Sequence, residues 1–262
     1  MQKVIPLKRF GQNYLHDKNI IEKIIHELNP QADDIIVEIG PGLGAITEFI
    51  YGKTKNFFVV EIDKRVIAEL KRKFSELQII SADFLKINTS DFIIPGKKKI
   101  RVVGNIPYNR TASIMFKIIR ESGWIKDAVF MVQYEVAKRI TASKGTKDYG
   151  ILTVLLNYFA DVKFCFKVSH NVFHPVPNVN SAVVHIKLKN LKITTEEREM
   201  MINMVKACFG NRRKTLKNSL SNSIFKELNF SGIGIDLSKR AEQLEAEDFV
   251  KLTKYARNQR PD

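Results

Sequence analysis

Short apolar runs alternate with amphipathic stretches over the first 140 residues. The runs have the length of buried strands, and the stretches between them repeat apolar residues with the period of a helix. The predicted strands are 35–39, 57–62, 77–82, 100–106 and 128–132, and the predicted helices are 20–28, 66–74, 111–121 and 135–140. Strands that alternate with helices predict a parallel, doubly wound sheet, so we expect an α/β fold.

The pattern changes after about residue 150. Segments 162–168 and 181–188 have strand patterns with only a loop between them, which predicts an antiparallel pair at the edge of the sheet. No strand pattern follows Leu188; segments 196–209, 214–228 and 247–256 have helical patterns. We therefore expect two domains, a sheet-containing domain at 1–190 and a small all-helical domain at 191–262.

The charge balance is unusual for a chain of ordinary composition. There are 43 basic and 28 acidic residues among 262, a net charge of +15, which favours a polyanionic partner such as nucleic acid. The apolar runs are too short to span a bilayer, and the N-terminus lacks a secretory signal. Two cysteines, Cys165 and Cys208, fit a reducing compartment, and the histidines lack metal-ligand spacing. We expect a cytoplasmic protein without membrane contact or metal.

A glycine-rich turn, Glu38-Ile39-Gly40-Pro41-Gly42-Leu43-Gly44-Ala45, follows the first predicted strand. Its spacing fits the dinucleotide fingerprint, and Glu61 ends the next strand, where a ribose-binding acid belongs. An NAD- or flavin-dependent oxidoreductase is therefore one alternative. However, Pro41 removes a backbone donor from a turn that would hold a pyrophosphate.

Acids also end three successive strands, at Glu38, Glu61 and Asp83. Carboxylates suit a ligand with a cationic centre and a ribose better than one with two phosphates. S-adenosylmethionine has a sulfonium, an ammonium and an adenosine. We assign Glu61 to the ribose hydroxyls and Asp83 to the adenine amine of this cofactor.

The tetrapeptide Asn105-Ile106-Pro107-Tyr108 follows the fourth predicted strand. The Asn105 side-chain oxygen can accept a hydrogen bond from an exocyclic amine, and Pro107 fixes the backbone so that the Ile106 carbonyl points the same way. Tyr108 can stack on a flat ring. A plain turn is the alternative for four residues alone. Their position downstream of the glycine turn and the strand-end acids favours a pocket in which an adenine amine is methylated.

With these parts in order, the sequence resembles the KsgA-type family of S-adenosylmethionine-dependent dimethylases, which act on adenines of small-subunit ribosomal RNA. The resemblance runs from residue 9 to about residue 220. Besides the glycine turn and the tetrapeptide, it is carried by the segments Lys8-Arg9-Phe10-Gly11-Gln12-Asn13-Tyr14-Leu15, 172–184 and 209–216. The resemblance implies a Rossmann-like class I methyltransferase fold.

It also implies a substrate and a set of contacts. The substrate would be two adjacent adenines in a 3′-terminal hairpin loop of 16S rRNA, within a pre-30S particle, and the enzyme would be a monomer. Phe173 would sandwich the target adenine against Tyr108. The implied cofactor contacts are Asn13, Leu15, Gly40, Gly42, Glu61, Asp83 and Asn105.

Three residues depart from the family pattern. Ile106 stands where Leu is usual, His174 replaces a small polar residue, and Asn180 replaces Asp. Ile at this position also resembles the Erm enzymes, which dimethylate an adenine of large-subunit rRNA, so an Erm-type enzyme is one alternative. A non-catalytic RNA-binding factor on the same fold is another.

Basic residues near the motifs are candidates for RNA contacts. Lys99, Arg101 and Arg110 flank the motifs, and Arg212, Arg213 and Lys214 form the clearest basic cluster of the C-terminal part. We assign RNA binding to Arg9, Arg110, Arg212, Arg213 and Lys214.

Overall fold

The computed structural model describes residue 6 and residues 12–96, 99–211 and 213–259. The chain forms two compact units. The first contains residues up to Ala137 and Val162–Leu188, and the second contains Lys138–Asp161 and the residues from Lys189 onward. The chain crosses between the units for the last time between Leu188 and Lys189, and Lys138–Asp161, which precedes the predicted boundary near residue 190, belongs to the second unit.

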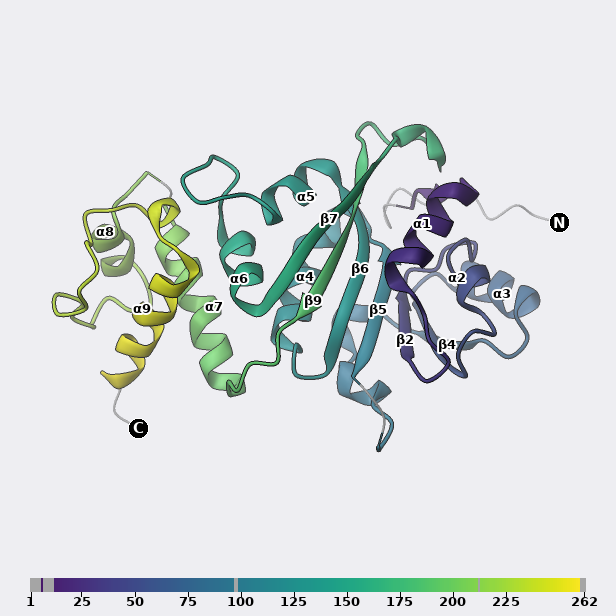
Figure 1. The fold of residues 1–262 in the computed structure, drawn as a ribbon, viewed down its shortest axis with the longest axis horizontal. Coiled ribbons are helices and arrows are strands. Elements are labelled where there is room, and N and C mark those ends of the chain that lie inside the picture. Colours follow the sequence, from purple (N-terminus) through teal and green to yellow (C-terminus); the bar gives the residue numbers. More distant parts are fainter. Residues whose placement is uncertain (1–5, 7–11, 97–98, 212, 260–262) are drawn as a thin grey trace. The chain divides into compact units, whose positions relative to one another are not determined.

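A seven-stranded sheet forms the first unit, in the order β4-β3-β2-β5-β6-β9-β7 (Figure 1). Strands β4, β3, β2, β5 and β6 are parallel, and β9 runs antiparallel to β6. The strands are β2 (Ile35–Ile39), β3 (Asn56–Glu61), β4 (Gln78–Ser81), β5 (Ile100–Asn105), β6 (Ile125–Gln133), β7 (Ala160–Val168) and β9 (Ser181–Leu188). The predicted doubly wound sheet is confirmed, and β7 and β9 lie side by side at its edge as predicted.

Helices accompany the parallel strands. Asp17 caps α1, with Oδ1 accepting from the Ile20 amide at 3.0 Å, and α1 buries Ile21, Ile24 and other apolar residues in the core. Strands β2 and β5 are buried on both faces, as expected for a parallel sheet covered by helices. The helices of this part are α1 (Lys18–Leu28), α2 (Thr47–Ile50), α3 (Lys64–Lys73), α4 (Thr111–Arg120) and α5 (Tyr134–Ile140).

Two short strands form a separate antiparallel pair that the sequence did not predict. In this pair β1 (Tyr14–Leu15) lies beside β8 (Phe173–His174), with Tyr14 opposite His174 and Leu15 opposite Phe173. It joins the N-terminal motif to a loop more than 150 residues later in the chain. Two-residue strands have no recognisable periodicity, so only tertiary structure reveals them.

The second unit is helical, as predicted for the C-terminal part. Its helices are α6 (Ile151–Phe159), α7 (Thr195–Phe209), α8 (Leu216–Ser221) and α9 (Ala246–Asn258). Helix α6 packs against α7 and α9, and a capping box at Thr194 and Glu197 begins α7. The predicted helix 214–228 is shorter in the structure. The side chains of Asn222 and Ser223 bond backbone carbonyls of α8, which ends it near Ser221.

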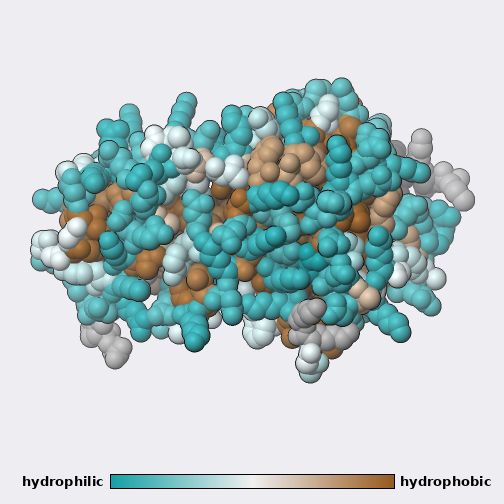
Figure 2. Space-filling model, viewed as in Figure 1, coloured by the Kyte–Doolittle hydropathy of each residue, from teal (hydrophilic) through white to brown (hydrophobic). Residues whose placement is uncertain are grey.

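The face drawn in Figure 2 is mostly hydrophilic, with apolar side chains visible in separate areas. In the part of the chain that the structure describes, none of the helices combines the length and apolarity needed to cross a lipid bilayer.

Candidate active site

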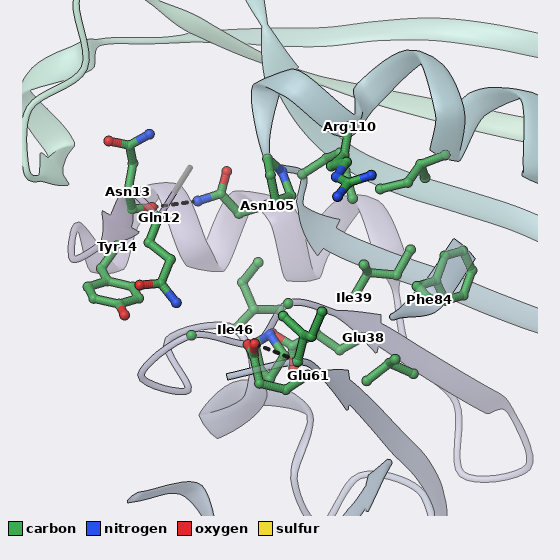
Figure 3. Close-up of a pocket in the computed structure, with 18 of the residues that line it drawn as sticks. Gln12, Asn13, Tyr14, Glu38, Ile39, Ile46, Glu61, Phe84, Asn105 and Arg110 are labelled. Carbon is green, nitrogen blue, oxygen red and sulfur yellow. Dashed lines mark hydrogen bonds between the residues drawn. The ribbon is translucent and has the colours of Figure 1, made fainter. Parts of the chain in front are cut away.

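A cavity of about 300 Å³ lies at the carboxyl ends of β2, β3, β4 and β5 (Figure 3). The carboxyl ends of parallel strands meet at one edge of a sheet, and ligands of such folds bind in the crevice there. The cavity is lined by the glycine turn, the ends of β3 and β5, the segment after β4 and N-terminal residues 12–15. Every predicted cofactor-binding residue is among its lining residues: Asn13, Leu15, Gly40, Gly42, Glu61, Asp83 and Asn105.

The glycine turn forms the floor under the N-terminal segment. Gly42 has a φ of +56°, and a Cβ there would lie 2.9 Å from the ring of Tyr14, so only glycine fits. The Gly40 amide donates to Val60 O and the Gly44 amide to Pro41 O. Since these amides are used within the protein and Pro41 has none, the turn offers a pyrophosphate few donors.

Glu61 and Asp83 are held by backbone amides. Glu61 Oε1 accepts from the amides of Ile62 and Asp63 at 2.8 and 2.9 Å, and burial raises the pKa of this carboxyl. Asp83 Oδ1 accepts from the Leu85 amide at 3.0 Å, and its Oδ2 makes no hydrogen bond with a described residue. Both carboxylates therefore have fixed positions in the cavity wall, as hydrogen-bond acceptors for a ligand must.

Glu38 differs from the other two acids. It is 1% exposed, and Thr47 Oγ1 donates to its Oε2 at 2.7 Å. Burial, with the nearby Glu61 adding repulsion, raises the pKa of Glu38 to about 8. Burial therefore favours the neutral form of Glu38, and its hydrogen bond with Thr47 joins the end of β2 to the start of α2.

The Asn105 side chain has one fixed orientation. Its Nδ2 donates to the Asn13 carbonyl at 2.8 Å (Figure 3). A carbonyl can only accept, so Nδ2 faces Asn13 and Oδ1 is left to accept from a ligand. Gly104 lets β5 approach β2 closely, because a Cβ there would lie 2.6 Å from Ile39 O.

The rest of the tetrapeptide is also anchored. The Ile106 amide donates to Met131 O at 3.0 Å, which fixes the Ile106 backbone against β6. The Tyr108 hydroxyl lies 2.8 Å from Ser181 Oγ at the start of β9, and burial raises the Tyr108 pKa. Pro107 and Tyr108 line the cavity with Asn105, so the structure brings the predicted catalytic turn together at one place.

Phe173 is the exception among the predicted catalytic residues. It is 1% exposed, packs in the hydrophobic core and is not among the residues that line the cavity. Its pairing with Leu15 in β8 and β1 directs it to the interior. The structure therefore does not support the predicted sandwich of a base between Phe173 and Tyr108.

Two further residues that line the cavity, Gln12 and Tyr14, had no role predicted from the sequence. Gln12 Nε2 donates to Asp63 Oδ2 at 3.1 Å, and the adjacent Arg65 lowers the pKa of Asp63 to about 2. The buried Tyr14 hydroxyl has no partner among the described residues, and burial raises its pKa to about 12. Their only sequence signal is position, since they flank Asn13 in one motif.

The predicted RNA-binding residues lie in both units. Arg110 lines the cavity of the first unit, and Arg213 and Lys214 are exposed in the second. Arg9 and Arg212 lie outside the described residues. Arg101 is buried rather than free for RNA: its guanidinium bonds both oxygens of Asp127 at 2.7 and 2.6 Å and Asp34 Oδ2 at 2.8 Å.

The sheet order, the glycine turn and the strand-end acids define a class I S-adenosylmethionine-dependent methyltransferase. A family model described as ribosomal RNA adenine dimethylase matches residues 7–258. The chain belongs to this family, and it is an rRNA adenine dimethyltransferase that uses S-adenosylmethionine. The lining of the cavity fits this cofactor. Its carboxyl groups can accept hydrogen bonds from an adenosine and face a cationic centre, and its glycine turn has few free amides for a phosphate.

Individual relatives agree with this assignment. A ribosomal RNA small subunit methyltransferase A of Francisella tularensis is 42% identical over 253 residues, 95% of this chain and 96% of that protein. A dimethyladenosine transferase from Plasmodium falciparum, known from its crystal structure, has 25% sequence identity to this chain. Its fold matches with a TM-score of 0.73, and the match covers 91% of this chain and 95% of that one. The 23S rRNA methyltransferase ErmE is also 25% identical, with a TM-score of 0.66 over 94% of this chain and 100% of that one.

Proposed function

We propose that this enzyme dimethylates two adjacent adenines in a 3′-terminal hairpin loop of small-subunit (16S) rRNA. The 42% identity to a small subunit methyltransferase over 95% of the chain supports the small subunit as the substrate. The observation that carries the chemistry is the hydrogen bond from Asn105 Nδ2 to Asn13 O, which leaves Asn105 Oδ1 as an acceptor for an adenine amine.

The cofactor supplies an electrophilic methyl group when bound, and the chain holds it in place. Glu61 binds the ribose hydroxyls and Asp83 accepts from the adenine amine of the cofactor. Asn13, Leu15, Gly40 and Gly42 complete the contacts. The support is that all six residues line the same cavity and that backbone amides fix both carboxylates.

The target amine is a poor nucleophile because its lone pair is delocalised into the ring. Asn105 Oδ1 and the Ile106 carbonyl accept its two N–H groups, which orients the nitrogen toward the cofactor and favours a tetrahedral geometry. Pro107 sets the backbone, and Tyr108 stacks on the base. The amine becomes acidic only once it is methylated, so no general base is required in the tetrapeptide.

The partner is the rRNA of a pre-30S particle, bound by a monomer in the cytoplasm. Arg9 and Arg110 would contact the RNA near the target, and Arg212, Arg213 and Lys214 would contact phosphates from the second unit. An unpaired loop lowers the cost of flipping each adenine, since its stacking is already partly lost.

Methyl transfer to isolated subunits tests this proposal. Unmethylated small and large subunits are incubated separately with the enzyme and labelled S-adenosylmethionine. We expect label in dimethyladenosine of small-subunit RNA only. Label in large-subunit RNA alone would support the Erm-type activity, for which the similarity to ErmE is the reason to test. Absence of label from both would support a non-catalytic RNA-binding factor.

A further inference from the structure

A second cavity lies within the C-terminal unit, beside the end of α7 and α8. It has a volume of about 230 Å³ and shares no lining residue with the cofactor cavity. We call it the C-terminal pocket. Its polar lining residues include Asn211, Lys214, Asn218, Ser219 and Asn222.

Three asparagines of the C-terminal pocket offer hydrogen-bond donors and acceptors, and hydrogen bonds within the protein orient two of them. Asn211 Oδ1 accepts from the Arg213 amide at 3.2 Å, so its Nδ2 is left to donate. Asn222 Nδ2 donates to Asn218 O at 2.7 Å, so its Oδ1 is left to accept. The Asn218 side-chain amide makes no hydrogen bond with a described residue and can do both.

The hydroxyl of Ser219 indicates that the pocket receives a polar group. Ser219 lines the pocket and is 6% exposed, and its Oγ has no hydrogen-bond partner among the described residues. Leaving a buried hydroxyl unpaired is unfavourable, and a ligand or a water that bonds it removes that cost. The neighbouring Ser223 hydroxyl, in contrast, already donates to Leu220 O and accepts from the Phe225 amide.

Positive charge lies beside these polar groups. Lys214 lines the pocket, is exposed and forms no ion pair with a described residue, and Arg213 is exposed next to it. A simple anion would use Lys214 but would face the free Asn222 oxygen. A ligand that carries a phosphate together with a ring bearing both donors and acceptors satisfies all of these groups. Nucleotides have this chemistry, and asparagine amides pair well with base edges.

We propose that the C-terminal pocket binds one unpaired nucleotide of the RNA substrate, with its base on Asn211, Asn218 and Asn222, its phosphate on Lys214 and one of its polar groups on the Ser219 hydroxyl. The cavity is smaller than typical pockets for drug-sized ligands, so it has no room for more than one nucleotide. This inference rests on the proposed function for its RNA. It adds that the second unit reads a base that is not the one methylated.

The first test is NMR titration of the full-length protein with ¹⁵N-labelled asparagine. The probes are the four nucleoside monophosphates, with ribose 5-phosphate as the probe that lacks a base. We expect the side-chain amide signals of Asn211, Asn218 and Asn222 to shift with at least one nucleotide and not with ribose 5-phosphate. Absence of shifts, or equal shifts with ribose 5-phosphate, would overturn the proposal.

The second test measures small-subunit affinity with Asn218→Leu and a matched control, Asn258→Leu. Both residues are exposed on helices of the same unit, but only Asn218 lines the pocket. We expect Asn218→Leu to weaken binding about 10-fold, as for loss of one base contact, and the control to bind as the wild type does.

These results separate the pocket from the proposed function. If the wild-type enzyme methylates small subunits and Asn218→Leu binds them with wild-type affinity, the pocket proposal fails alone. If the wild-type enzyme methylates no small-subunit RNA, the proposed function fails, and the nucleotide titration still tests the pocket. Circular dichroism and thermal unfolding check that both variants fold.

Discussion

Replacing Glu38 by Gln changes how the stability of the protein depends on pH. Burial raises the pKa of Glu38 from 4.5 to about 8 in the folded protein. As pH rises between these values, the unfolded chain loses this proton while the folded protein keeps it, so unfolding becomes more favourable. The contribution of this pKa difference to the free energy of unfolding is complete below pH 4.5 and is lost as the pH approaches 8. Over this pH range the free energy of unfolding falls by at most about 5 kcal/mol for this reason.

The Glu38→Gln variant keeps an oxygen that can accept from Thr47 Oγ1 but has no proton to lose. Urea unfolding of both proteins is measured at several pH values between about 5 and 8. We expect the free energy of unfolding of the variant, relative to wild type, to increase steadily with pH. Glu76→Gln, at an exposed side chain, is the control for replacing Glu by Gln where the carboxyl is not buried. A difference for Glu38→Gln that does not change with pH would refute the reasoning.

Three further substitutions test other parts of the structure. Asn105→Ala removes the side-chain oxygen that is proposed to accept from the target adenine amine. We expect kcat for methyl transfer to fall by about 10²–10³ while the affinity for small subunits is unchanged. Turnover at the wild-type rate would contradict this role of Asn105. Arg101→Met removes the guanidinium that pairs with the buried Asp34 and Asp127, which among the described residues keep only the Gln31 amide and His185 as partners, so we expect a loss of about 3–5 kcal/mol in urea unfolding. The exposed Arg72→Met should cost far less, and equal losses would count against the reasoning. Gly104→Ala places a Cβ 2.6 Å from Ile39 O, so we expect about 1–3 kcal/mol of destabilisation; unchanged thermal unfolding would disprove the close approach.

Much of the sheet could be predicted because buried parallel strands have short, continuous apolar runs. The predicted strands 35–39 and 100–106 correspond closely to β2 and β5. Helix α6 was missed because its residues are apolar over most of the helix, with Val154, Leu155 and Leu156 buried in succession. Such a run fits a buried strand or a buried helix equally well.

Site residues could be predicted from the sequence where they lie at the carboxyl ends of parallel strands. Glu61 and Asp83 line the cavity because Glu61 ends β3 and Asp83 lies two residues after the end of β4. The hydrogen bond between Asn105 and Asn13 joins residues 92 positions apart, and no local pattern encodes it. The same holds for Arg101, whose charge indicated a surface position although two distant carboxylates keep it buried.

The position of β9 affects how the protein is completed during synthesis. Strand β9 lies between β6 and β7, although it follows both in the chain. The hydrogen-bonding edge of β6 is therefore uncovered until residues 181–188 have left the ribosome. Ser181, the partner of the Tyr108 hydroxyl, emerges in the same step. A nascent chain that stops earlier carries the cofactor-binding motifs but exposes a strand edge prone to aggregation. Strand β9 therefore both joins β6 to β7 and anchors Tyr108.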